Sequence, residues 1–281
     1  KTGEPLCPER YDIDDLSELR ASVGPWTWAA RYQQTPAPRS GGIFKSEWFR
    51  SFTTVDDGYL LDLGNERSRL VDPDDCYRFV TVDLAFTRRK HSDFTAAAHW
   101  AVAPQTFDQN GEVVHPTVLI WTGLDRVKIE GAQHLELLRR AWEWEPRPAW
   151  VGVEQTTAGI AIIAQARRDG IPVRELKPDR NKAARAETAA TLMMAGRVFF
   201  PADAEWLWKA QSELLLFPNG RNDDVVDVLA YAANEVVRGQ LPAGRWKGYT
   251  GPITVEEKIR AQIERQQAAR RGDRHPILGR V

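Results

Sequence analysis

Five acidic residues occupy positions where a soluble fold would normally place apolar or neutral side chains. Asp83 interrupts an apolar, strand-like run, and Glu154 ends a second one. Asp223, Asp224 and Asp227 stand at the start of a helical pattern whose other positions are mostly apolar. A carboxylate in or beside a core costs several kcal/mol unless it is paired or bound to a metal. These five acids are therefore the candidate chemical groups of the chain.

Each acid also has a purely structural alternative. Asp83 could cap a loop at the end of its strand, and Glu154 could form an ion pair with Arg167 or Arg174. In the acidic cluster that opens the last helix, the corresponding roles are an N-cap, a first-turn acid and a solvated surface residue for Asp223, Asp224 and Asp227. The pattern formed by all five acids is more informative than any one of them.

Carboxylates that converge without a cysteine or a partnered histidine make an oxygen-only site. Such a site favours Mg²⁺ or Mn²⁺ over zinc. Two ions about 3.5–4 Å apart can activate a water molecule and stabilise the leaving oxygen of a phosphodiester, as in two-metal nucleases. Repulsion among the carboxylates should strain the metal-free site. The acids thus predict a nuclease that uses two divalent ions.

The periodicity of the chain predicts elements that could bring these acids together. Three strands joined by polar links come first and favour an antiparallel meander, and helices and strands then alternate. The predicted strands are 77–86, 94–102, 117–122, 150–154, 173–176 and 198–200, and the predicted helices are 130–144, 160–168, 183–195, 204–215 and 225–237. This order predicts an α/β fold, a mixed β-sheet with helices on both faces, and it is the order of the ribonuclease H-like fold. We expect the 150–154 strand to pair in parallel with the first strand, which places Asp83 beside Glu154.

Composition limits the classes of protein to which the chain can belong. Its 281 residues include 38 Lys and Arg against 39 Asp and Glu, so a basic shell over the whole surface is excluded. No apolar run approaches the roughly 20 residues of a membrane span, and no secretory signal opens the chain. Two distant cysteines, Cys7 and Cys76, suit reduced thiols in a cytoplasmic compartment. We expect a soluble protein with no membrane association.

The chain divides into three predicted parts. Residues 1–50 are rich in aromatic and turn-forming residues and are expected to be a connector or docking arm, and residues 51–240 carry the globular pattern. Residues 241–281 form a basic tail, for which a solvated terminus and a contact for DNA or an acidic partner are both open.

Two groups of basic residues follow strand ends near the expected site. They could hold DNA phosphates through contacts that do not depend on base sequence, and solvated turns are the alternative. The groups are Arg88, Arg89 and Lys90, and Lys177, Arg180, Lys182 and Arg185.

Several segments, in order, resemble the C-terminal nuclease domain of the large terminase subunit of tailed bacteriophages, a DNA-packaging motor protein. They are Trp28-Ala-Ala-Arg-Tyr-Gln-Gln-Thr-Pro, Val82-Asp-Leu-Ala with Ser92-Asp-Phe-Thr-Ala, Val153-Glu-Gln, and Asn222-Asp-Asp-Val-Val-Asp-Val-Leu-Ala-Tyr-Ala. The resemblance implies that Asp83, Glu154 and Asp224 are catalytic metal ligands. Asp223 and Asp227 would have supporting or alternative roles as ligands. The chain departs from many relatives at Asn222, where they have histidine.

The resemblance also implies partners and a location. We expect double-stranded DNA as substrate, the portal protein and the small terminase subunit as partners, and the cytoplasm of the infected bacterial host as the compartment. The family's ATPase domain is expected elsewhere in a full-length chain, because no Gly-x-x-x-x-Gly-Lys-Ser/Thr phosphate loop occurs here. Two alternatives are another ribonuclease H-like nuclease, such as a junction resolvase, and a docking module whose nuclease site is vestigial.

Overall fold

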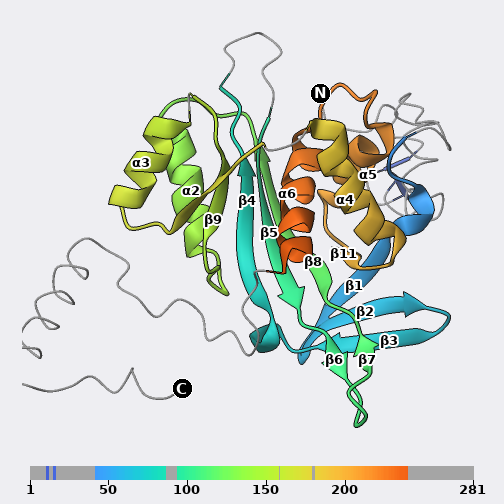
Figure 1. The fold of residues 1–281 in the computed structure, drawn as a ribbon. Helices are drawn as coiled ribbons and strands as arrows, with labels where there is room; N and C mark the ends of the chain where they lie inside the picture. The colour runs from blue at the N-terminus through green and yellow to red at the C-terminus, as the bar shows by residue number, and fades with distance from the viewer. Residues whose placement is uncertain are drawn as a thin grey trace, which may run out of the picture.

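One large mixed β-sheet forms the centre of the protein. The computed structural model describes residues 11–12, 15–16, 42–86, 94–157, 159–178 and 181–239. The strands of the sheet are β1 (Arg50–Val55), β2 (Gly58–Gly64), β3 (Arg67–Val71), β4 (Tyr77–Asp83), β5 (Thr95–Ala103), β8 (Val118–Val127), β9 (Val151–Glu154), β10 (Val173–Leu176) and β11 (Val198–Pro201). They lie in the order β10-β9-β4-β5-β8-β11-β1-β2-β3 (Figure 1). A separate hairpin consists of β6 (Thr106–Phe107) and β7 (Val113–His115).

The strand pairing confirms the predicted mixed sheet. Strands β4, β5 and β8 pair antiparallel, whereas β9 pairs in parallel with β4, and β10 in parallel with β9. The centre of this arrangement is the ribonuclease H-like order expected from the sequence. Every residue of β5 and all of β4 except Asp83 are buried, which explains their nearly continuous apolar sequences.

Helices cover both faces of the sheet, as predicted. They are α2 (Gln133–Glu143), α3 (Ile160–Arg168), α4 (Lys182–Met194), α5 (Leu207–Leu216) and α6 (Asp224–Arg238), with 3-10 turns at Ser46–Trp48 and Pro73–Asp75. Helices α2 and α3 lie on one side of β4 and β9, and α4, α5 and α6 lie on the other (Figure 1). One core therefore packs Val80 and Val82 with Leu138, and a second core packs Phe79 and Trp100 with α6.

Helix α6 is fixed to the centre of the sheet by a buried threonine. The Thr81 hydroxyl donates a hydrogen bond to the carbonyl of Val228 in α6 at 2.8 Å. The same hydroxyl accepts one from Trp100 Nε1, also at 2.8 Å. Since side chains alternate along a strand, Asp83 lies on the same face of β4 as Thr81, which is the face that α6 covers.

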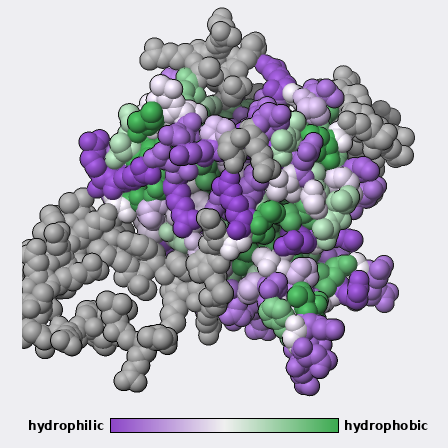
Figure 2. All heavy atoms as spheres, in the orientation of Figure 1, coloured by the Kyte–Doolittle hydropathy of each residue, from purple (hydrophilic) through white to green (hydrophobic). Residues whose placement is uncertain are grey.

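Two regions differ from the sequence-based expectation. The antiparallel meander β1–β2–β3 was not predicted, because its exposed edge strand β3 alternates irregularly between polar and apolar residues. Phe44, in the predicted arm, is buried in the main core. The face drawn in Figure 2 is largely hydrophilic, with smaller hydrophobic areas between the polar residues. Within the described residues, no helix combines the length and apolar character needed to cross a membrane.

Candidate active site

Two of the predicted acids end neighbouring parallel strands. Asp83 is the last residue of β4, and Glu154 is the last residue of β9. The register pairs Val82 with Val153, so the next residues along the two strands, Asp83 and Glu154, lie side by side at this edge of the sheet. The two acids are both partly buried. The sheet thus brings together carboxylates that are 71 positions apart in the sequence.

The start of α6 brings the remaining acids to the same edge. Asp224 and Asp227 belong to the first turn of α6 and are only 3% and 5% exposed, so the solvated role considered for Asp227 is wrong. Asp223 holds the N-cap position, but its side chain forms no capping hydrogen bond. The Thr81 contact holds α6 against β4 and so fixes where these acids lie.

The electrostatics of Asp83 show that the acids share one region. Burial, followed by the charges of Asp227, Glu154 and Asp224, raises the pKa of Asp83 well above its usual range, and the ammonium of Lys182 only partly opposes this. Three carboxylates from two other elements therefore repel charge at Asp83. This is the strained acidic cluster that the sequence predicted.

Side-chain cations neutralise part of this negative charge. Lys182 Nζ bridges Asp223 and Asp227 at 2.5 Å from each carboxylate. Arg185 contacts the other oxygen of Asp227 at 3.1 Å. Although burial lowers the pKa of Lys182, attraction to Asp227 and Asp223 outweighs it and raises the pKa overall. Lys182 is therefore a fixed positive charge within the cluster.

Neither of the structural ion pairs considered for Glu154 forms. Arg167 binds Glu175 at 2.7 Å, and Arg174 lies 4.0 Å from Glu235. Glu154 instead lies close to the buried hydroxyl of Tyr231 in α6. Burial, and then the Glu154 charge, raises the pKa of Tyr231. Glu154 thus faces the acidic cluster.

Two further residues of the site were not identified from the sequence. Arg126, in the second half of β8, binds Asp224 at 3.0 Å and Glu213 at 2.7 Å. Glu213 comes from α5 and also accepts a hydrogen bond from the backbone N–H of Val225 at 2.6 Å. Burial raises the pKa of Glu213 to about 7, although Arg126 opposes the shift. A glutamate beside Leu214 and Leu215 was the one available signal, and it did not reveal the partner.

The donor set has the chemistry of a hard-cation site. Asp83, Glu154, Asp224 and Asp227 offer only carboxylate oxygens, which suit Mg²⁺ or Mn²⁺. Among the described residues, however, no three acidic, histidine or cysteine side chains lie close enough together to form a preassembled metal site. The physical reason is visible in the ion pairs: Lys182, Arg185 and Arg126 hold Asp227 and Asp224, while Asp83 and Glu154 repel each other.

The residues predicted to contact DNA fall into three groups. Lys182 and Arg185 point into the acidic cluster, and Lys177 is exposed just after β10. Arg88, Arg89, Lys90 and Arg180 lie outside the described residues. Their contacts with DNA stay predictions.

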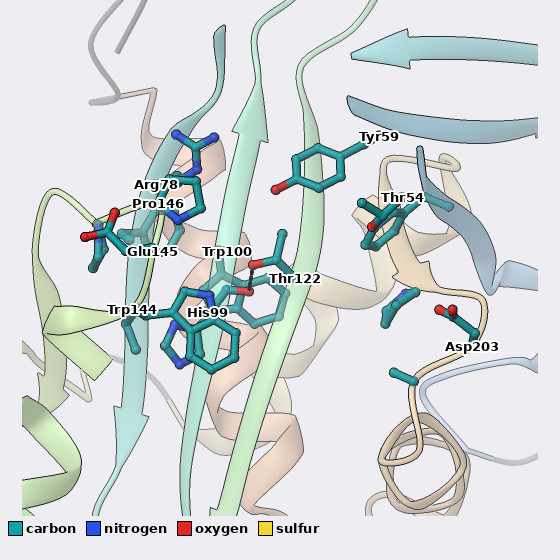
Figure 3. A pocket seen from close by; sticks show the side chains of 16 residues that line it. Thr54, Tyr59, Arg78, His99, Trp100, Thr122, Trp144, Glu145, Pro146 and Asp203 are labelled. Atoms are coloured by element: carbon teal, nitrogen blue, oxygen red, sulfur yellow. Dashed lines mark hydrogen bonds between the residues drawn. The ribbon is translucent and has the colours of Figure 1, made fainter. Parts of the chain in front are cut away.

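A pocket of about 320 Å³ lies elsewhere on the sheet (Figure 3). Arg78, Trp144 and Glu145 line one side, and Tyr59, Thr54 and Asp203 line the other. None of the five acids contributes to its lining. The candidate active site is therefore the edge of the sheet at the start of α6, and not this hollow.

A family comparison decides the identity of the fold. The profile of the terminase RNase H-like domain matches residues 80–235, which include the strands and helices that carry Asp83, Glu154 and Asp224. The chain belongs to this family. In this terminase domain the ribonuclease H-like sheet is the conserved architecture of the match, and the acids lie at the ends of its central strands. No curated protein matches the chain closely by sequence.

Solved structures of phage terminases resemble this terminase domain. The large terminase nuclease of thermophilic phage G20c is 18% identical, with a TM-score of 0.43, over 70% of this chain and 99% of that one. The nuclease domain of Thermus phage P74-26 is also 18% identical, with a TM-score of 0.42, over 68% and 94% of the two chains. A complete large terminase from another thermophilic bacteriophage is 15% identical, with a TM-score of 0.48, over 81% of this chain and 54% of that one. Structures of the G20c domain contain magnesium, zinc or cobalt.

Proposed function

We propose that this protein is a divalent-metal-dependent endodeoxyribonuclease that cuts concatemeric double-stranded phage DNA during genome packaging. The observation that carries the proposal is the partly buried Asp83 carboxylate, which lies among Glu154, Asp224 and Asp227 and has a raised pKa. Membership of the terminase RNase H-like family supports the same activity. Metal-bound structures of the G20c domain are consistent with a requirement for divalent ions.

Asp83, Glu154 and Asp224 would hold Mg²⁺ or Mn²⁺, with two ions as the expected number and Asp223 and Asp227 in supporting or alternative positions. When bound, the ions would supply Lewis acidity for a water nucleophile and for the leaving oxygen. Hydrolysis forms a bond between the water oxygen and phosphorus and breaks the bond from phosphorus to the 3′ oxygen. The products would be 3′-hydroxyl and 5′-phosphate ends.

The cations of the site would prepare it for this chemistry. Lys182 and Arg185 hold Asp227, and Arg126 holds Asp224, so the acids keep defined positions despite their mutual repulsion. The same cations lower the electrostatic cost of bringing a DNA phosphate near the carboxylates. Their role would be to position the carboxylates and balance their charge.

Replacing Asp83 with asparagine tests the proposal. Asp83→Asn keeps the size of the side chain but removes the charge needed to bind a metal ion. We expect nicking of supercoiled plasmid DNA to fall by at least a hundredfold with Mg²⁺ or Mn²⁺, while DNA affinity changes little. The matched control is Asp56→Asn in the exposed turn between β1 and β2, which should cut as the unmodified chain does.

Three outcomes would contradict the proposal. Asp83→Asn with full activity would remove the assigned site. Absence of nicking by the unmodified chain with both ions would favour a docking module with a vestigial site. A strong preference for four-way junctions over linear duplex would indicate a resolvase instead.

The remaining parts of this proposal concern the surroundings of the protein. We propose that it acts with a terminase ATPase domain, the portal protein and the small terminase subunit, in the cytoplasm of an infected bacterium. Co-purification with portal assemblies would test these contacts.

A further inference from the structure

A second site with the opposite charge lies at the far end of α4. A pocket of about 490 Å³ opens between the β1–β3 meander, the β7 segment and the end of α4. Arg50, Arg67 and Arg69 line it together with His115, and no acidic residue contributes to the lining. Most clusters of arginine on a protein surface are balanced by nearby carboxylates, and this one has none in its walls.

Arg69 is the clearest sign that an anion belongs there. Its side chain is buried, with 9% of its surface exposed. Its two terminal nitrogens donate to the carbonyls of Pro104 and Pro116, at 2.8 and 3.2 Å. These neutral partners fix the guanidinium but leave its charge uncompensated, and burying an uncompensated charge is costly. Burial accordingly lowers the pKa of Arg69.

The other two arginines add charge that no carboxylate balances. Within the described ranges, neither Arg50 nor Arg67 forms an ion pair. The nearest acids, Asp62 and Glu66, line a neighbouring hollow on the other side of β2 and β3, to which Arg67 also contributes. The Asp62 carboxylate is engaged by the backbone N–H of Gly64 at 2.8 Å. Planar guanidinium groups that converge on one hollow match the geometry of a phosphate.

Helix α4 links this pocket to the acidic cluster. Its first residue, Lys182, binds Asp223 and Asp227, and Ala195 and Gly196, directly after its last residue, line the arginine pocket. A helix of 13 residues is roughly 20 Å long. Phosphates along one DNA strand are about 3.4 Å apart along the axis, so about six base pairs separate the two positions. Glu187 is the single acidic residue of α4 between them.

We propose that the arginine pocket binds a phosphate of the DNA backbone about six base pairs from the cleavage position. This inference rests on the proposed function, because it takes the ligand to be the DNA substrate. The contact would not depend on base sequence. It would anchor the duplex at a second point and set the direction in which it crosses the acidic cluster.

Salt-dependent DNA binding tests the pocket without any cleavage. The affinity of the protein for a 30-base-pair duplex is measured in EDTA at several salt concentrations. Arg67→Gln should lower the slope of log affinity against log salt by about 0.9, and Arg50→Gln combined with Arg67→Gln by about 1.8. The double variant should bind roughly tenfold more weakly at moderate salt. Replacing both arginines with lysine should restore most of the slope.

The matched control is Arg168→Gln, which removes one exposed arginine from α3 on the other face of the sheet. This variant should bind DNA as the unmodified chain does. An unchanged thermal midpoint shows that the pocket variants are folded. If the double variant has the same slope as Arg168→Gln, the pocket holds no DNA phosphate, and an acidic protein segment becomes the ligand to seek.

Plasmid nicking by the same proteins separates the two proposals. If the unmodified chain does not nick DNA but the pocket variants still lose slope, the nuclease assignment fails and the phosphate contact stands. If the unmodified chain nicks DNA and the pocket variants bind it normally, only the phosphate contact fails.

Discussion

Asp83 and Asp227 belong to one acidic cluster, but their charges are compensated very differently. Asp227 has two cationic partners, Lys182 and Arg185, within 3.1 Å. Asp83 forms no ion pair with another described residue, and three neighbouring carboxylates add to the effect of burial on its pKa. The ionised form of Asp83 is therefore the most costly charge of the cluster for the folded state.

The raised pKa of Asp83 predicts that its removal stabilises the metal-free protein. An acid whose pKa is higher in the folded than in the unfolded state loses stability as the pH rises from about 4 through the folded-state pKa. Asp83→Asn should thus be more stable than the unmodified chain at pH 8 in EDTA, by about 0.5–2 kcal/mol. Urea unfolding at pH 5 and pH 8 measures this, and Asp56→Asn is the control. Equal stability at pH 8 would show that Asp83 is not strained.

At the scale of elements, α5 completes the start of α6. The first N–H groups of a helix lack partners within it, and Asp223 at the N-cap position does not supply one through its side chain. Glu213 of α5 accepts the N–H of Val225 instead and also binds Arg126 of β8. One carboxylate thus joins two helices and a strand directly behind the acidic cluster.

Glu213 variants should separate its hydrogen bonding from its charge. Glu213→Ala leaves a buried N–H without a partner and should cost about 1–3 kcal/mol of unfolding free energy. Glu213→Gln keeps an acceptor oxygen and should cost less. Because the pKa of Glu213 is raised to about 7, the unmodified chain should lose stability as the pH rises from about 4.5 to 7. Urea unfolding across this range should show a flatter profile for Glu213→Gln, and an unaltered profile would contradict the assignment.

The elements that carry the predicted acids could be recognised from the sequence because their apolar runs are long and strongly periodic. Strand β4 and helix α6 are buried almost throughout, so Asp83, Asp224 and Asp227 stand out against them. The meander β1–β3 was missed because its edge strand is mostly exposed and its residues follow no clear alternation. Arg126 was missed because its pairing with Asp224 depends on the relative positions of β8 and α6.

Across the whole molecule, an almost neutral chain separates its charges along one helix. The net charge is −1, yet carboxylates gather at the start of α4 and unpaired arginines at its end. Composition alone excluded only a uniformly basic surface. The spatial separation depends on the sheet order, which places β1–β3 beside β11 and far from β9.

Divalent ions should stabilise the whole domain if the acids bind them. At a concentration one hundred times the dissociation constant, a ligand that binds only the folded state contributes about 2.7 kcal/mol. For a domain of this size, this corresponds to a rise of roughly 5–10 °C in Tm. Thermal unfolding with Mg²⁺ or Mn²⁺ should show the rise for the unmodified chain and for Asp56→Asn, but not for Asp83→Asn. A rise of the same size in all three would place the ions elsewhere.

The ammonium group of Lys182 between Asp223 and Asp227 has a consequence for ion selectivity. Any ion that engages Asp227 competes with a positive charge that is already there. A monovalent ion carries no more charge than the ammonium it would displace and gains little by replacing it. A divalent ion brings twice the charge, so an internal competitor of this kind discriminates against the sodium and potassium that are abundant in any cell.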